Sequence, residues 1–481
     1  MSRYFSSFFP DSSTHRLVAA VFFIALIFRL AIFGYLYFTL GEYHGLAWVD
    51  GSQYVALAKN IASGNGFSES SVPPFLPHTL RTPGYPWFLA AFYGAFGNFW
   101  SASLAEAVLN SFVPLFIFWL ALKLSGNSRI AFVAGLLTAV DYHIAVHTLT
   151  LNTESIFVFL AVLSAVFIFR YIEKPDILKA TAIGLLFGFG ALTRPLLYYA
   201  FVPIFIFFVF ALRSIEWRRR IAGAACFLLI AFAITIPWMY RNYRVSGEFT
   251  LSTLGWFNMY TRMAAMVQAA ASHQSYTESL QVLVGGLNEG GYISRADEHE
   301  LFDVKFIPLL RERAIEILKA HPRETLLVQI NSVQTLFTQD DLLYILNHSH
   351  LLPDAKRPPI PLSLLVMQKG VSAWRDMLPY LKGQYLIPYL MRVVWIVFFA
   401  LAVLGVWSLA RSGEYKQKVM TWFLVALIGF IVVVSLPVSA SLNARYRIPF
   451  APFYFIFVAA GMVHIFGRTH KLALKTGTHT V

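Results

Sequence analysis

The sequence predicts an all-α, polytopic membrane protein, and three observations support this fold class. First, 57% of the 481 residues are hydrophobic and only 13% are charged, whereas soluble globular chains carry about 25% charged residues. Second, apolar runs of roughly 20 residues, enough to cross a bilayer core as a helix, recur along the chain. Third, Lys and Arg gather in the short loops between these runs, which is the distribution that membrane topology imposes.

About ten membrane-spanning helices are expected, because each run can cross about 30 Å of hydrocarbon as a tilted helix. In chain order they cover residues 16–40, 103–124, 130–147, 153–171, 178–192, 196–212, 221–239, 389–409, 419–436 and 448–466. With the N-terminus inside, the cytoplasmic loops are "KLSGNSR", "RYIEKPDILK", "RSIEWRRR" and "RSGEYKQK", followed by the tail "GRTHKLALK". Each of these segments is basic, so the orientation is self-consistent.

Two longer segments then face outward. Residues 41–102 form the first outer loop, whose stretch "RTPGYPWFLAAFYGAFGNFW" is rich in Gly, Pro and aromatic residues and is expected to form interfacial helices. Residues 241–388 have apolar positions at helical spacing but too much charge for hydrocarbon, so we expect a small, mainly helical extracytoplasmic domain. The chain is thereby divided into an N-terminal transmembrane module (1–240), this outer segment, and C-terminal transmembrane helices with a basic cytoplasmic tail (389–481).

Composition also excludes several classes of function. The net charge of +13 is explained by the positions of the basic loops, so nucleic-acid binding is not indicated. The single cysteine, Cys226, rules out an intrachain disulfide and a cysteine-based metal site. No Gly-rich phosphate loop is present, and nucleotide-driven transport therefore lacks its usual motif.

Ionisable residues at the outer ends of the predicted spans are the most informative feature, because the topology rule does not supply them and burial makes them costly. They are Asp50, Arg81, Glu154, Arg194, Arg445 and Arg447, and the predicted topology puts all of them on the same side. Basic residues are biased to the opposite face of a membrane, so several outer arginines favour an anionic ligand.

Each of these residues also has a purely structural interpretation. Asp50 can cap the helix that begins at "GSQYVALAKNI", with Gln53 completing a capping box. Thr153 can cap the next outer helix start, where an acid such as Glu154 suits the helix dipole. The arginines can anchor the interface by snorkelling. Capping and catalysis are compatible, since a helix N-terminus keeps a carboxylate ionised and able to accept a proton.

A metal cluster is a further alternative near Glu154. Asp141, His143 and His147 lie shortly before it in the chain, but their spacing fits no strong zinc motif. The sequence therefore gives no metal ligands.

Several of these motifs, taken in order, resemble a known family. The series "FRL", "VDGSQYVALAKNIASGNGF", "LRTPGYPWFLAAFYGAFG", "LNTESIFVFL", "LTRPLLYY", "IPWMYRNYRVSGEF" and "ARYRIPFAPFY" is similar to bacterial members of the C-type glycosyltransferase superfamily. The group that it resembles most includes protein mannosyltransferases and the aminoarabinose transferases of lipid A. The resemblance runs from the first span to about the seventh and returns at the last one.

The resemblance implies roles for individual residues. Asp50 occupies the position of the family's catalytic acid, and Glu154 is similar to a second acid at the outer end of a later span. Arg81 matches the basic residue that touches the lipid phosphate. Further candidates for phosphate binding are Arg194, Arg241, Arg244 and Arg262, and other site candidates are Tyr54, Tyr85, Arg445 and Arg447. Many relatives have an acidic pair where Gly51 follows Asp50 here, so a divalent metal stays an open alternative.

The implied activity is transfer of a sugar from a polyprenyl-phosphate donor to a lipid, glycan or protein acceptor at the outer face of the inner (plasma) membrane. The residues 1–240 would be the catalytic module. Phosphate is already stable as an anion, so one base, Asp50, and an arginine cradle suffice, and in-line attack is expected to invert the anomeric centre. A transporter or flippase of a lipid-linked glycan is the alternative, and a noncatalytic scaffold is a third. A transporter is expected to have midplane charges and broken helices.

Overall fold

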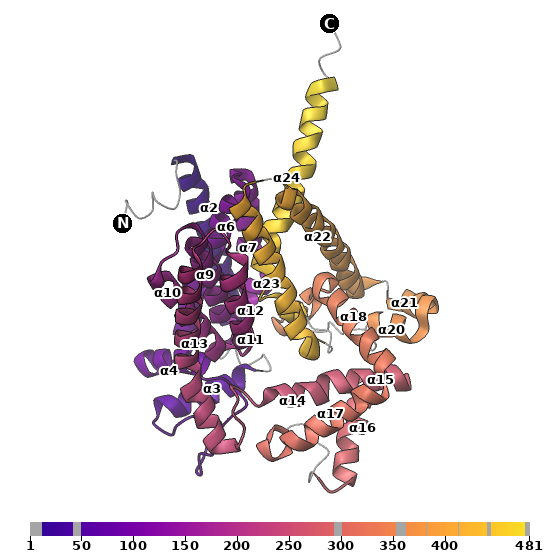
Figure 1. The fold of residues 1–481 in the computed structure, drawn as a ribbon. Helices are drawn as coiled ribbons and strands as arrows, with labels where there is room; N and C mark the ends of the chain where they lie inside the picture. The colour runs from indigo at the N-terminus through magenta and orange to yellow at the C-terminus, as the bar shows by residue number, and fades with distance from the viewer. Residues whose placement is uncertain are drawn as a thin grey trace.

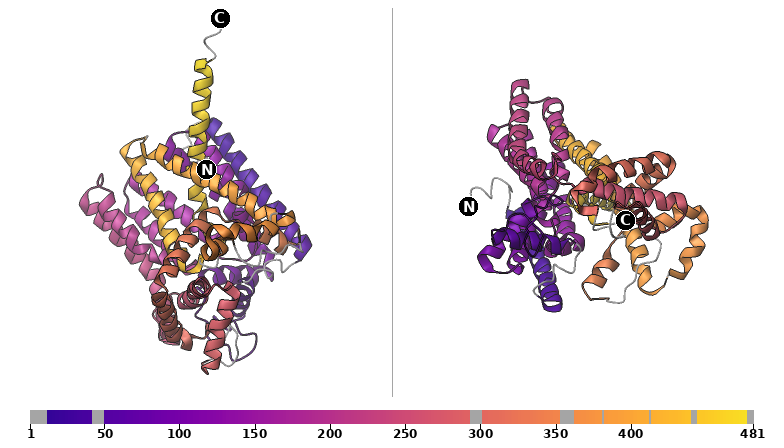
Figure 2. Two further views of the ribbon diagram at one scale, coloured as in Figure 1. Left: turned by 90° about the vertical axis from the view of Figure 1, so that its right-hand side faces the viewer. Right: turned by 90° about the horizontal axis from the view of Figure 1, so that it is seen from below.

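The computed structural model describes residues 12–41, 50–292, 301–352, 362–380, 382–411, 413–439 and 444–476. Throughout these ranges the regular structure is helical and no β-strand is present, so the predicted all-α class is confirmed. Long helices form a bundle, and shorter helices gather at the end of the bundle away from the C-terminus (Figures 1 and 2).

The N-terminal half of the bundle contains the first outer loop and the first group of apolar helices. Its elements are α2 (Ser12–Leu40), α3 (Gly51–Ala62), α4 (Gly84–Phe96), α5 (Trp100–Ser111), α6 (Val113–Ser125), α7 (Ser128–Val140), α8 (Tyr142–Leu149), α9 (Glu154–Glu173), α10 (Ile177–Thr193), α11 (Leu196–Tyr199), α12 (Phe201–Ile206), the π-helix η2 (Phe207–Ala211) and α13 (Trp217–Ser246). The 13 residues of α4 extend about 20 Å, too short to cross a bilayer.

The outer segment and the C-terminal helices follow. Their elements are α14 (Leu254–Asn258), η3 (Met259–Ala264), α15 (Ala265–Ser272), α16 (Tyr276–Glu289), η5 (Val304–Phe306), α17 (Ile307–Ala320), α18 (Pro322–Thr338), α19 (Leu342–His348), α20 (Leu362–Lys369), η6 (Gly370–Ser372), α21 (Ala373–Met377), η7 (Leu378–Tyr380), η8 (Gly383–Tyr385), α22 (Leu386–Arg411), α23 (Tyr415–Ser439), η9 (Ala444–Arg447) and α24 (Ala451–Thr476). Side chains from α14, η3, α16 and α17 form a small apolar core separate from that of the bundle.

Fewer helices than predicted are long enough to cross a membrane. Within the described ranges, six helical segments are long and apolar enough to cross a membrane, and the α7–α8 pair makes a seventh if it is one span. Three predicted spans correspond to shorter apolar helices, Ile177–Thr193, Leu196–Ala211 and Ala451–Gly467. The protein is thus a multi-pass helical membrane protein, but the count of ten is not confirmed.

The bend between α7 and α8 has a local cause. Asp141 has an extended backbone conformation, which ends α7, and its carboxylate accepts a hydrogen bond from the amide of Ile144 at 2.8 Å. Asp141 therefore caps α8, and the two helices meet at 44°. This bond gives Asp141 a structural task in place of the metal ligation considered from the sequence.

The predicted cytoplasmic loops meet at one end of the bundle. Lys123 pairs with Glu173 at 2.8 Å, and Lys416 donates to the Glu173 carbonyl at 3.3 Å. Tyr171 donates to the carbonyl of Arg219 at 3.2 Å. Because α9 runs for 20 residues from Glu154 to Glu173, about 30 Å separates this end from the one that holds Glu154.

The C-terminal helices α22 and α24 pack unusually closely. A Cβ atom at Gly405 would collide with the carbonyl oxygen of Phe457, and one at Gly461 would collide with that of Leu401. Only glycine at these two positions allows the two backbones to touch.

Candidate active site

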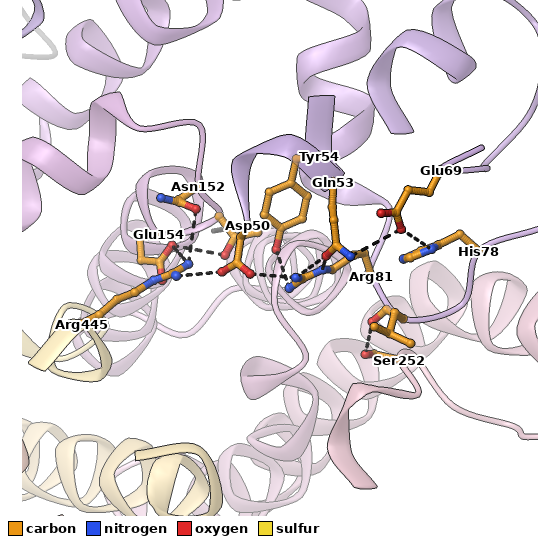
Figure 3. A network of polar contacts seen from close by, with 12 residues as sticks. Asp50, Gln53, Tyr54, Glu69, His78, Arg81, Asn152, Glu154, Ser252 and Arg445 are labelled. Carbon is orange, nitrogen blue, oxygen red and sulfur yellow. Dashed lines mark hydrogen bonds and ion pairs between the residues drawn. The ribbon is translucent and has the colours of Figure 1, made fainter. Parts of the chain in front are cut away.

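Asp50 lies between two arginines at the end of the bundle opposite the basic loops. Its Oδ1 accepts a hydrogen bond from Nη2 of Arg81 at 2.7 Å, and its Oδ2 accepts one from Nη1 of Arg445 at 2.7 Å (Figure 3). Asp50 directly precedes α3, but its side chain makes no capping bond to that helix. The predicted helix cap is therefore wrong, because the Asp50 carboxylate contacts two arginines instead of the backbone of α3.

Glu154 is the second carboxylate of the site and is almost completely buried, with 1% of its side chain exposed. Its Oε1 accepts hydrogen bonds from Arg194 Nη1 at 2.8 Å and from Arg445 Nε, while its Oε2 accepts one from Arg445 Nη2 at 3.0 Å. Arg445 thus binds Glu154 with two nitrogens, in the fork geometry that makes arginine–carboxylate pairs strong. Thr153 makes no capping bond.

These contacts join five charged side chains in one arginine–carboxylate network. Their order is Arg81, Asp50, Arg445, Glu154 and Arg194, with cations and anions alternating. Three guanidinium groups and two carboxylates leave a net charge of +1 in a largely buried site. Such a network compensates both acids internally and keeps an attraction for one further anion.

The electrostatic effect on Asp50 follows from these partners. Burial opposes ionisation of the carboxyl, but the guanidinium groups of Arg81 and Arg445 outweigh burial and hold the pKa of Asp50 below its ordinary value. Burial lowers the pKa of Arg81, but Tyr54 and Asp50 together hold it above its ordinary value. Asp50 is therefore ionised at neutral pH, and it is a weak base for as long as both arginines remain bound to it.

Neighbouring residues hold Arg81 in place. Gln53 accepts from Nε of Arg81 at 2.9 Å, and the hydroxyl of Tyr54 accepts from its Nη1 at 3.4 Å (Figure 3). The guanidinium carbon lies 5.2 Å from the centre of the Tyr54 ring. Tyr54 in turn makes an edge contact with the ring of Tyr85. Both tyrosines predicted from the sequence therefore lie beside the network, and Tyr54 touches it.

The loop that carries Arg81 is also fixed to the end of α10. The hydroxyl of Thr82 donates to the carbonyl of Thr193 at 2.9 Å. A Cβ atom at Gly84 would lie only 2.8 Å from the carbonyl oxygen of Leu192, which is closer than real Cβ atoms come to backbone atoms. The start of α4 therefore touches the C-terminal end of α10, and this contact sets the positions of Arg81 and Arg194 relative to each other.

A buried acid beneath the site was not identified from the sequence. Glu106, in α5, accepts hydrogen bonds from the hydroxyls of Ser155 and Tyr85. It is fully buried, and it links the neighbour of Glu154 to the aromatic pair below Arg81. The sequence did contain a signal for Glu106, because it is an acid inside an apolar run, where ionisable residues are rare.

Four predicted arginines do not belong to the network. Arg241 stacks on Trp238 at 4.8 Å and donates to the carbonyl of His78. Arg244 is exposed, and Arg262 donates to the Tyr276 hydroxyl at 2.7 Å. Arg447 is buried elsewhere. Of the arginines expected to bind phosphate, the network therefore brings Arg81 and Arg194 together, with Arg445 between the two acids.

The described residues include no group of three or more His, Cys, Asp or Glu side chains placed to hold a metal ion. The oxygens of Asp50 and Glu154 are instead engaged by arginines. His143, considered earlier as a ligand, lies 3.5 Å from Asp340 in a different cluster.

The comparison with protein families addresses the predicted resemblance. Residues 80–240 match the model of a family described as dolichyl-phosphate-mannose-protein mannosyltransferase. The predicted resemblance is confirmed over this segment. The match covers about a third of the chain and includes three members of the network, Arg81, Glu154 and Arg194. A search of curated proteins finds no match.

Among the solved structures that resemble this chain overall are those of two proteins, AglB and ArnT. The archaeal oligosaccharyltransferase AglB from Archaeoglobus fulgidus, in complex with an inhibitory peptide and a dolichol-phosphate, is 11% identical at a TM-score of 0.48, over 98% of this chain and 53% of that one. ArnT from Cupriavidus metallidurans in the apo state is 15% identical at 0.38, over 91% and 77%. Its form bound to undecaprenyl phosphate is 13% identical at 0.36, over 95% and 80%. The chain spans about half the length of AglB.

Proposed function

We propose that this chain is an integral-membrane glycosyltransferase that moves a sugar from a polyprenyl-phosphate-linked donor to an acceptor on the extracytoplasmic side of the membrane. The observation that carries the proposal is Asp50 held between Arg81 and Arg445 at one end of a helical membrane bundle. The family match supports it, because the matched segment contains Arg81, Glu154 and Arg194.

The proposed reaction needs a base and an anion site. The acceptor oxygen attacks the anomeric carbon, the bond from that carbon to the phosphate oxygen breaks, and polyprenyl phosphate leaves with the bonding electrons. The acceptor's proton passes to Asp50. Charge grows on the leaving phosphate, so donors already in place around it stabilise the transition state. Attack from the side opposite the phosphate inverts the anomeric centre.

Asp50 becomes a better base when the donor is bound. In the structure its pKa is held low mainly by Arg81 and Arg445 against the effect of burial. A phosphate that takes over hydrogen bonds from Arg81 would weaken one of these two pairs. Proton affinity at Asp50 would then rise at the moment when a base is required. Arg445 remains tied to Glu154, so the second acid keeps the site assembled.

The proposed orientation is supported by the difference between the two ends of the bundle. The basic loops around Lys123, Arg219 and Lys416 lie at the end away from the network. Under the positive-inside rule that end faces the cytoplasm. The network would then lie on the extracytoplasmic side of the inner membrane. We further propose that residues 1–240 are the catalytic module, which Arg445 completes from the C-terminal segment, and that the outer segment 241–388 selects the acceptor.

Arg81 gives the decisive test. Purified protein would be supplied with a synthetic polyprenyl-phosphate sugar and an envelope extract as acceptor, and released polyprenyl phosphate would be measured together with the glycosylated product. We expect Arg81→Lys to retain part of the turnover, because lysine offers a point charge without the fork. Arg81→Ala should lose about 10² to 10³ in rate.

A suitable control is Arg220→Ala. Arg220 is likewise a partly buried arginine beside an aromatic ring, but it belongs to the basic end of the bundle, where it donates to the carbonyl of Val209 and stacks on Trp217. Full turnover by Arg81→Ala at every donor concentration would remove Arg81 from the site. Movement of intact donor across proteoliposomes without release of polyprenyl phosphate would replace the transferase with a transporter.

A further inference from the structure

The short helix η9 carries two arginines that face different clusters. Arg445 and Arg447 are two residues apart in a 3-10 helix, where successive side chains point about 120° apart. Arg445 bridges the carboxylates of Asp50 and Glu154. Arg447, with only 2% of its surface exposed, is buried in a second polar cluster formed by α8, α22 and the junction between α18 and α19.

Arg447 is held by carbonyl groups and an aromatic ring. Its Nη1 donates to the carbonyl of Gln339 at 2.7 Å and to that of Leu336 at 3.3 Å, at the C-terminal end of α18. Its guanidinium carbon lies 3.3 Å from the centre of the Trp395 ring, in α22. The carbonyls at a helix C-terminus attract a cation, and stacking on tryptophan fixes the plane of the guanidinium.

Asp340 fixes the surroundings of Arg447. Its fully buried carboxylate accepts hydrogen bonds from the Tyr142 hydroxyl at 2.5 Å, from Nε1 of Trp395 at 2.7 Å and from the amide of Leu342 at 2.7 Å. Three elements, α8, α22 and the α18–α19 junction, therefore converge on one side chain. The ring on which Arg447 stacks is oriented by this contact.

We infer that Arg447 is a positioning residue that fixes η9 against the α18–α19 junction so that Arg445 can bridge Asp50 and Glu154. The catalytic consequence rests on the proposed function, whereas the positioning itself does not. Arg445 must reach carboxylates on two different elements at 2.7 and 3.0 Å, which tolerates little displacement of its backbone. Through Arg447, the outer segment is in direct contact with the turn that carries the central arginine of the network.

The positioning can be measured without any enzymatic assay. Carbodiimide coupling modifies protonated carboxyls, so the pH at which Asp50 becomes labelled, read by mass spectrometry of the purified protein, reports how firmly its arginines hold it. Besides Arg81 and Arg445, the ionisable groups that face Asp50 are Tyr54, Glu154, His147 and Tyr446. Arg447→Ala changes none of them directly.

We expect Arg447→Ala to raise the pH of half-maximal Asp50 labelling in the same direction as Arg445→Ala, and Arg447→Lys to shift it less. Arg220→Ala serves as the matched control and should leave it unchanged. If Arg447→Ala does not fold, Tyr142→Phe removes only the hydroxyl bond to Asp340, whereas Trp395→Phe removes the Nε1 bond to Asp340 and part of the ring surface under Arg447. Both should give smaller shifts in the same direction. Unchanged labelling in all of the folded variants, while Arg445→Ala shifts it, would overturn the inference.

Kinetics then separate positioning from substrate contact. A displacement of about 1 Å at the site costs about 10² in rate, so we expect Arg447→Ala to lower kcat by that order and to change the donor KM less. The loss should be non-additive with Arg445→Ala, because both changes remove the same bridge. If no glycosyl transfer is found in the unmodified protein, the proposed function fails, and the labelling experiment still decides whether Arg447 positions Arg445.

Discussion

The two ends of the bundle hold ion pairs of the same length in different surroundings. At the basic end, Lys123 and Glu173 are 2.8 Å apart, and their side chains are 38% and 36% exposed. At the other end, Arg194 and Glu154 are also 2.8 Å apart, but their side chains are 17% and 1% exposed. Distance alone does not separate the two pairs, whereas burial does.

The difference shows what each pair contributes. An exposed pair is hydrated and screened, and it contributes about 0 to 1 kcal/mol to stability. A buried carboxylate is costly unless cations compensate it, and a buried pair is often no more stable than an apolar replacement. The basic end is therefore explained by topology, while the retention of two buried acids with three arginines at the other end is better explained by chemistry.

Removal of Arg445 should produce the largest effect. Arg445→Ala leaves Glu154 and Asp50 with one arginine each, and removal of one partner from a buried pair costs about 3 to 5 kcal/mol. We expect a loss of this size in the free energy of unfolding, measured by denaturation in detergent, together with loss of glycosyl transfer. An unfolding free energy equal to that of the unmodified protein would show that the pair at this end is as weak as the exposed one.

Replacement of Asp50 should separate activity from stability. Asp50→Asn keeps the size of the side chain, and the partners keep other acceptors, Gln53 for Arg81 and Glu154 for Arg445. We expect turnover to fall by about 10², the range for a positioned base, with a loss of stability smaller than that of Arg445→Ala. Glu154→Gln should lose more stability, since Glu154 is the more deeply buried acid. Equal turnover in Asp50→Asn and the unmodified protein would leave Asp50 with a structural role alone.

Low pH should reduce the stability of the folded protein, because it protonates Asp50. The folded-state pKa of this carboxyl is lowered because Arg81 and Arg445 outweigh burial. Its contribution to stability is thus complete above the unfolded value, about 3.9, and is lost as pH falls from there towards the folded value. We expect thermal unfolding to show this contribution unchanged from about pH 7 to 5. Asp50→Asn should lose less stability than the unmodified protein below about pH 4, and parallel curves would contradict the depressed pKa.

The smallest effect is expected at the basic end. Lys123→Ala removes the exposed pair with Glu173, which should cost at most about 1 kcal/mol, and turnover should stay unchanged. High salt should reproduce the stability change in the unmodified protein, because exposed pairs are screened. A loss comparable to that in Arg445→Ala would remove the contrast between the two ends.

The sequence alone was sufficient to predict the helical membrane class and the positions of the apolar helices, because both depend on apolar runs and basic loops; it did not establish how many of these helices span the membrane. Topology also put Asp50, Arg81, Glu154 and Arg194 on one side before any contact was known. It did not separate Arg445 from Arg447, since two residues in one short motif share the same side of the membrane. Which of them enters the network depends on the direction of each side chain around η9, and that is a property of tertiary packing.

The absence of the predicted helix caps was beyond the sequence for a similar reason. Asp50 and Thr153 stand where helix caps are expected, but neither side chain makes a capping bond; at Asp50 the carboxylate is engaged by arginines distant in the chain. Glu106 differs from them, because an acid within an apolar run is rare and its position already indicates a buried polar contact.

The contact between Gly405 and Gly461 limits the movement of α22 relative to α24. Because their backbones touch, we expect α22 and α24 to behave as one rigid unit. This unit includes Trp395, which lies in α22, and it adjoins η9, which shortly precedes α24. We therefore expect any movement in this part of the bundle to carry α22 and α24 together. Because Arg447 also contacts the end of α18, Arg445 keeps a fixed place between this helix pair and the outer segment.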